Sequence, residues 1–237
     1  MLKTKKLNNF TKNILRIIIA SAIFFIEQVA ATIFVYNPTL KILFISLSIL
    51  ITMCIIAIWY MYRHNKKYHD QKPTNILSIM KTSIYGTLVI LFTSVIANVI
   101  MLGIGKLLHI VNKQSANQEL LTNIQHHNSY GFIYILILTI IVGPILEEFM
   151  FRYIPTINNP KSNLWLTIFG ILFVIAHLLD DFSALNLAQP SSIYIVLTHA
   201  VTYAVPAIVF SVIYARKQNM ANNIATHALG NALSIIL

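Results

Sequence analysis

Charged side chains are what this sequence lacks most. Only 10% of its 237 residues are charged and 57% are hydrophobic, whereas a soluble domain carries roughly 25% charged residues. Acids are the scarcest, with seven Asp and Glu against 17 Lys and Arg. This composition excludes an ordinary soluble domain and indicates a chain that crosses a membrane several times.

Two further features of the composition limit the possible classes of protein. The only cysteine, Cys54, excludes an internal disulfide. The net charge of +10 does not indicate a nucleic-acid partner, because the basic residues lie between apolar runs instead of along one amphipathic face. Such a distribution sets membrane topology, and we expect a lipid bilayer and no nucleic acid among the partners.

Seven apolar runs have, or nearly have, the roughly 20 residues that a spanning helix needs. We therefore predict an all-α fold, a polytopic transmembrane bundle of about seven spanning helices. The fifth and seventh runs are short, and the first is too long for the apolar region of a signal peptide. The runs are Ile14–Tyr36, Leu40–Tyr62, Thr82–Leu108, Gly131–Tyr153, Leu164–Leu179, Ile193–Tyr214 and Ala221–Leu237.

Lys and Arg distribution predicts the orientation. With seven spans, 14 of the 17 basic residues fall on one side, and only Lys41, Lys106 and Lys113 fall on the other. The positive-inside rule then predicts a cell-membrane protein with a cytoplasmic N-terminus and a C-terminus outside. Asp180 and Asp181 would face outside and anchor a helix end.

A polar outer segment, Lys106–Tyr130, divides the chain. We predict an N-terminal unit over residues 1–130, with about three membrane helices and this outer loop. Residues 131–237 form the second unit, with about four helices and nearly all polar groups at membrane depth. Glu27 is the buried acid of the first unit, and we expect it to serve helix packing or a cavity.

The stretch Glu147-Glu148-x-x-x-Arg152 ends the fourth apolar run. Ionisable groups at membrane depth are rare and indicate function. Glu148 and Arg152 are four residues apart and can pair along a helix, which leaves Glu147 free to point elsewhere. We expect the helix to continue through Pro155 to about Ile157, which would bury these groups. The alternative is a solvated helix end at the membrane surface.

Two later stretches add polar groups, Phe173-x-x-x-His177 and His227-x-x-x-Asn231. Taken singly, His177 is typical of a packing residue, and His227 with Asn231 of interhelical hydrogen bonding. Counting about 1.5 Å per residue from the helix starts puts His177 roughly 20 Å and His227 roughly 9 Å deep. Tilt or a short helix must close that gap of about 10 Å if the two histidines are to meet.

Together these residues provide the parts of a hydrolytic site. A glutamate in an apolar setting can act as general base, and histidine and asparagine supply its partner and an oxyanion site. No Gly-x-Ser motif and no pair of intramembrane aspartates is present, which counts against serine and aspartyl intramembrane proteases. His199 lies outside these stretches, near the outer end of its helix.

The three motifs, in this order and each on its own apolar helix, resemble those of the CPBP (Abi) family. That family includes type II CAAX prenyl endopeptidases and bacterial lysostaphin-resistance-A-like proteins. The resemblance covers about Gly131 to Leu237. It implies a site inside the bilayer where Glu147 and His177 activate a water and His227 and Asn231 stabilise the oxyanion, with Glu148 and Arg152 in structural support.

The resemblance thus predicts an intramembrane endopeptidase acting on a peptide or a membrane-associated protein, in peptide maturation, bacteriocin processing or bacteriocin self-immunity. The alternative is a catalytically silent scaffold that regulates a partner membrane protein. The presence of every motif residue favours the enzyme. A transporter would predict inverted repeats, and the sequence has no internal repeat.

Metal dependence stays open at this stage. Glu147, His177 and His227 are residue types that bind zinc, so a metalloprotease is one reading. The HExxH motif, however, is absent, and the spacing does not decide between zinc and a metal-free site.

Overall fold

The computed structural model describes residues 2–68, 75–110, 119, 122, 129–183 and 185–236. Over these residues the chain is helical, with no strand, so the predicted all-α fold is confirmed. Most of the outer segment 106–130 lies outside the described residues, and the division of the chain near residue 130 stays a prediction.

Five helices or helical stretches are long and apolar enough to cross a membrane. They include α1 (Leu2–Tyr36), α2 (Leu40–Tyr68), α3 (Ile76–Leu107) and α10 (Pro190–Lys217). The fifth is a composite helix over Tyr130–Thr156. The two runs expected to be short form α8 (Asn163–His177) and α11 (Met220–Ile236), of 15 and 17 residues. A bundle of about seven membrane helices agrees with this arrangement.

The composite helix is built from several segments. It runs through α5 (Ser129–Ile137), the π-helical turn η1 (Leu138–Val142), α6 (Gly143–Glu148), the π-helical turn η2 (Phe149–Tyr153) and α7 (Ile154–Thr156). As expected, the helix therefore passes Arg152 and Pro155 before it ends.

Local sequence accounts for the helix ends. The side chain of Asn75 accepts a hydrogen bond from the Leu77 N–H and caps α3, and Ser162 caps α8 through the Trp165 N–H. At its other end, α10 stops at Gln218, which adopts a left-handed conformation with φ of 51°.

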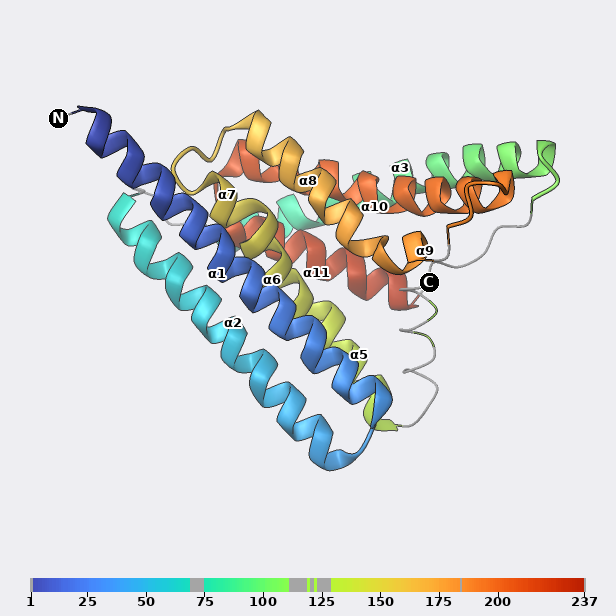
Figure 1. Ribbon diagram of the computed structural model, residues 1–237, viewed down its shortest axis with the longest axis horizontal. Coiled ribbons are helices and arrows are strands. Elements are labelled where there is room, and N and C mark those ends of the chain that lie inside the picture. The colour runs from blue at the N-terminus through green and yellow to red at the C-terminus, as the bar shows by residue number, and fades with distance from the viewer. Residues whose placement is uncertain are drawn as a thin grey trace.

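The helices form two groups that meet at the middle of the composite helix (Figure 1). On one side α1 packs against α2, and both contact α6 and η2. On the other side α3 packs against α10 and α11, and α8 packs against α10. Because α11 contacts α6 and α8 contacts η2, the two groups are joined where the composite helix carries its charged residues.

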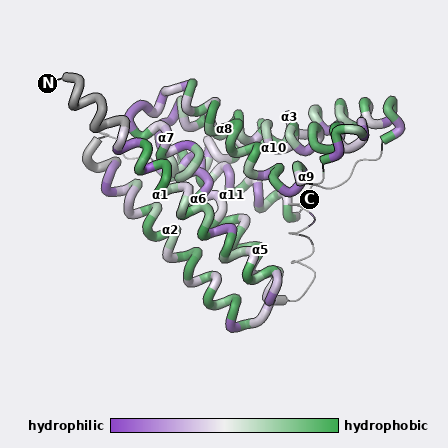
Figure 2. Tube along the Cα trace, viewed as in Figure 1, coloured by the Kyte–Doolittle hydropathy of each residue, from purple (hydrophilic) through white to green (hydrophobic). Residues whose placement is uncertain are grey.

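Hydropathy follows this arrangement (Figure 2). Apolar residues dominate α1, α2 and α3, and hydrophilic residues are frequent along α6, α7 and α11. Only 6% of the apolar window of α3 is buried by the rest of the protein, so its outer surface suits lipid. The chain is therefore a multi-pass membrane protein with its polar groups turned inward.

Candidate active site in the membrane interior

Two π-helical turns flank the two glutamates. In each, a backbone N–H bonds to the carbonyl five residues earlier, Gly143 to Leu138 in η1 and Ile154 to Phe149 in η2. A proline follows each of these N–H groups, Pro144 and Pro155. Proline has no N–H, and its ring clashes with the carbonyl four residues before it, so the wider turn relieves the clash. Such turns are frequent at functional sites.

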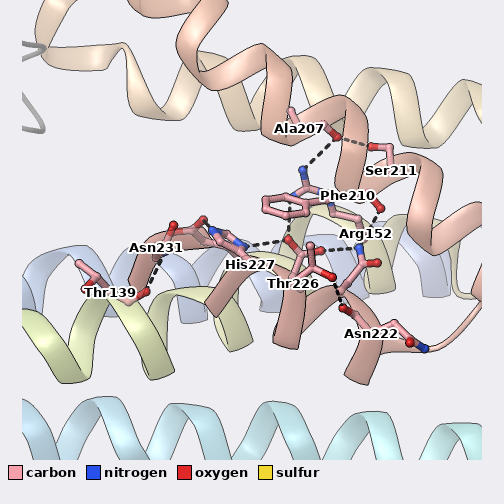
Figure 3. Close-up of polar contacts among 12 residues, drawn as sticks. Thr139, Arg152, Ala207, Phe210, Ser211, Asn222, Thr226, His227 and Asn231 are labelled. Atoms are coloured by element: carbon pink, nitrogen blue, oxygen red, sulfur yellow. Dashed lines mark hydrogen bonds and ion pairs between the residues drawn. The ribbon is translucent and has the colours of Figure 1, made fainter. Parts of the chain in front are cut away.

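The Asn231 side chain of α11 supplies a hydrogen bond that Pro144 cannot donate. The Thr139 carbonyl lies five residues before Pro144 and cannot receive a backbone hydrogen bond from it. The Asn231 side-chain amide donates to this carbonyl at 2.8 Å (Figure 3). One of its two amide hydrogens is thus committed to holding α11 against η1, and the second is left for another acceptor.

Glu148 is fully buried and held by three side chains. Its Oε1 accepts from Arg152 Nη1 at 3.2 Å and from His227 Nδ1 at 3.0 Å. Its Oε2 accepts from Asn223 Nδ2 at 2.9 Å. The alternative of a solvated helix end is therefore wrong. Glu148 is instead a shared hydrogen-bond acceptor that joins α6, η2 and α11.

Arg152 is as deeply buried as Glu148. Its guanidinium lies between two aromatic rings, 4.6 Å from the Phe173 centroid and 5.4 Å from that of Phe210. Its Nη2 also donates to the Ala207 carbonyl at 3.4 Å (Figure 3). The ion pair and the cation–π contacts keep this charge in an apolar region.

Glu147 points away from Glu148 and toward two histidines. Its Oε2 lies 3.6 Å from His227 Nε2 and 4.0 Å from His177 Nε2. The same oxygen is buried and has no hydrogen-bond partner among the described residues. Both histidines, from α11 and α8, thus converge on one carboxylate oxygen.

The estimate that His177 and His227 differ by about 10 Å in depth is wrong. His177 is the last residue of α8, and His227 lies in the second turn of α11. Their Nε2 atoms nevertheless lie within 4.0 Å of the same Glu147 oxygen, because the two helices are inclined to each other (Figure 1). Counting residues along each helix cannot show this inclination.

Hydrogen bonds fix which histidine nitrogen faces Glu147. His177 Nδ1 lies 2.9 Å from the Phe173 carbonyl, and His227 Nδ1 lies against Glu148. Carbonyl and ionised carboxylate oxygens only accept, so each Nδ1 must carry a hydrogen. Each ring therefore presents Nε2 to Glu147.

Aromatic rings hold both imidazoles in place. His227 stacks on Phe210 with centroids 4.5 Å apart. His177 lies against Phe173 at 4.4 Å and against Tyr203 at 4.7 Å. The histidines therefore have few alternative rotamers, which is what a preorganised site requires.

Sequence reasoning missed Asn223, Phe210 and Tyr203. Asn223 donates to Glu148 and also to the Phe210 carbonyl, at 2.9 Å each. A signal for it exists, since Asn223, His227 and Asn231 follow one another every four residues along one face of α11. Phe210 and Tyr203 lie in an apolar helix where the sequence does not distinguish them from other core aromatics.

Three other acids that the sequence singled out are Glu27, Asp180 and Asp181. Glu27 of α1 is buried, and the atom Oε2 has no hydrogen-bond partner in the described part of the chain. Asp180 is exposed, as expected of an outer anchor. Asp181 is buried, with Oδ1 3.2 Å from His199 Nδ1, and the outer side of the membrane stays a prediction for both aspartates.

The residues do not form a zinc centre as they are arranged. Glu147, His177 and His227 are suitable ligand types, but the described residues contain no group of three His, Cys, Asp or Glu placed to hold a metal ion.

The geometry thus brings a partly buried glutamate, Glu147, and two oriented histidines together inside the helical bundle. Residues 129–233 match the family model described as type II CAAX prenyl endopeptidase Rce1-like, so this part of the chain is similar to that family. The resemblance to the CPBP and CAAX protease family is thereby confirmed, and the match supports a protease of the intramembrane CAAX type. No curated protein and no solved structure matches the chain.

Proposed function

We propose that the protein is an intramembrane endopeptidase that hydrolyses a peptide bond in a membrane-associated peptide or protein. The observation that carries the proposal is the approach of two imidazole Nε2 atoms, at 3.6 and 4.0 Å, to one otherwise unpartnered oxygen of Glu147. A water molecule between these groups can donate one hydrogen to Glu147 and the other to His177.

The chemistry follows from this placement. Glu147 takes a proton from the water while the water oxygen attacks the carbonyl carbon of the scissile bond. The carbonyl oxygen becomes an oxyanion, which is stabilised by His227 and by a hydrogen bond from the second amide hydrogen of Asn231. When the C–N bond breaks, Glu147 passes its proton to the departing nitrogen, and the products are a carboxylic acid and an amine.

Glu148 and Arg152 have supporting roles in this scheme. Glu148 holds His227 through Nδ1, so that Nε2 faces the substrate side. Arg152 balances the Glu148 charge and ties it to the Phe173 and Phe210 rings. For the biological process we favour peptide maturation, bacteriocin processing or bacteriocin self-immunity, which would place the substrate at the membrane.

The test is cleavage by the purified, detergent-solubilised protein. Wild type and Glu147→Ala are incubated with a fluorogenic peptide library, with and without a chelator, and products are identified by mass spectrometry. Cleavage by wild type that Glu147→Ala lacks supports the hydrolase, and loss in chelator would assign a metal. Equal cleavage by both proteins contradicts the mechanism. If Glu147→Ala keeps full biological activity in cells, the scaffold alternative replaces the enzyme.

Replacing Asn223 should lower kcat more than replacing its neighbour Asn222. Replacing Asn223 with leucine removes a hydrogen bond to a charged group, about 1.5 kcal/mol, which corresponds to roughly a tenfold lower kcat. Asn222 is a matched control, because it is equally buried on the next position of α11 and its amide oxygen has no hydrogen-bond partner among the described residues. Equal kcat losses in Asn222→Leu and Asn223→Leu would contradict a specific role.

The orientation also remains a prediction. The distribution of Lys and Arg predicts the N-terminus in the cytoplasm and the C-terminus outside the cell membrane. Reporter fusions that are active only outside the cytoplasm should give signal at the C-terminus and none at the N-terminus. Signal at the N-terminus alone would invert the assignment.

A further inference from the structure

A second pair of ionisable side chains is buried beside the candidate site. Asp181 lies in the short helix α9 (Leu179–Ser183) and His199 lies in α10. Oδ1 of the aspartate is 3.2 Å from Nδ1 of the histidine, and both side chains are more than nine-tenths buried. Burying two ionisable groups is costly, and the hydrolytic scheme uses neither of them.

The pair is connected to His177 from two directions. Along the chain, α8 ends at His177, Leu178 leaves the helical conformation with φ of −105° and ψ of 3°, and Asp181 follows in α9. Across the bundle, Tyr203 lies one turn after His199 on the same face of α10, and its ring packs against the His177 ring. The Asp181–His199 contact and the ring contact therefore lie next to the end of α8.

His177 needs such support because of its position. The last residue of a helix has no following turn to restrain it, and helix ends fray. Among the described residues, its Nδ1 lies within hydrogen-bonding distance of its own helix, at the Phe173 carbonyl. The ring direction toward Glu147 is therefore set by what holds α9 and α10 against the end of α8.

We propose that Asp181 and His199 are positioning residues that fasten α9 to α10 and thereby hold His177 Nε2 toward Glu147. The inference rests on the proposed function, since it concerns the same site. A misplacement of 1 Å in a catalytic group can cost about 10²-fold. Loosening the Asp181–His199 contact should move the His177 ring by less than about 1 Å. We therefore expect kcat to fall about tenfold with KM unchanged.

The test compares adjacent aspartates. Asp181→Asn removes the charge with almost no change in shape, and Asp180→Asn makes the same substitution at the exposed neighbour. With the library peptide that wild type cleaves fastest, Asp181→Asn should lose about tenfold in kcat, and Asp180→Asn should match wild type. The exchanged variant Asp181→His/His199→Asp should recover most of the lost kcat.

A measurement on His177 itself makes the test independent of cleavage. In ¹⁵N-histidine NMR spectra, with the His177 signal identified by its loss in His177→Gln, wild type should show a single Nδ1–H form. Asp181→Asn should broaden or shift that signal, and Asp180→Asn should leave it unchanged.

An unchanged His177 signal in Asp181→Asn overturns the inference. A kcat loss in Asp181→Asn that the exchanged variant fails to recover also overturns the inference. A kcat loss that is accompanied by a matching loss of folded protein at the assay temperature overturns it as well. Failure of the proposed function looks different, because Glu147→Ala would then cleave like wild type. The NMR result still decides the positioning role in that case.

Discussion

A Glu147→Gln enzyme should fold normally and lose peptide cleavage. Glutamine keeps the size and shape of glutamate but cannot take a proton from water, and a general base contributes about 10²–10⁴-fold to rate. We expect kcat to fall within that range with KM little changed, because Glu147 acts on the water and not on substrate binding. Steady-state kinetics on a single fluorogenic peptide measure both constants.

The structure explains why the fold should tolerate this change. Glu147 Oε2 has no hydrogen-bond partner among the described residues, so the substitution breaks no hydrogen bond of that oxygen. The thermal unfolding midpoint should therefore stay close to that of wild type. Glu27→Gln is the comparison, since it makes the same substitution at another buried glutamate, and it should keep most of the activity. A Glu147→Gln enzyme with wild-type kcat would remove the general base from the mechanism.

Some of this site follows from residue spacing alone. Glu148 and Arg152 are four apart, and their predicted contact is present at 3.2 Å. The expected continuation of the helix through Pro155 is also present, because a proline inside a helix costs a hydrogen bond but need not end it. Contacts within one helix depend only on its period, which the sequence contains.

Other features depend on the way helices meet. The π-helical turns add residues to a turn without changing the apolar pattern, so the hydrophobic periodicity of Leu138–Tyr153 does not reveal them. The convergence of His177 and His227 depends on the inclination of α8 to α11. The Asp181–His199 contact depends on a short helix after Leu178 that turns the chain inward. Each of these requires three-dimensional packing.

Replacing Arg152 with methionine should destabilise the protein strongly. Methionine fills much of the space between Phe173 and Phe210 but leaves the Glu148 carboxylate without its cation. Removing one partner of a buried ion pair costs about 3–5 kcal/mol. The free energy of unfolding, measured by titration with a denaturing detergent, should fall by that amount. Arg216→Met, at an exposed position of α10, should change it by about 0.5 kcal/mol or less.

A double variant separates the charge from the packing. If the loss in Arg152→Met comes from an uncompensated carboxylate, then Glu148→Gln in the same chain should recover part of it, because contacting residues are not additive. Glutamine keeps an acceptor for His227 Nδ1 while removing the charge. Equal instability of the single and double variants would show that the aromatic contacts of Arg152, and not its pairing with Glu148, hold this region together. The two residues would then be independent supports, and Glu148 would act through His227 and Asn223.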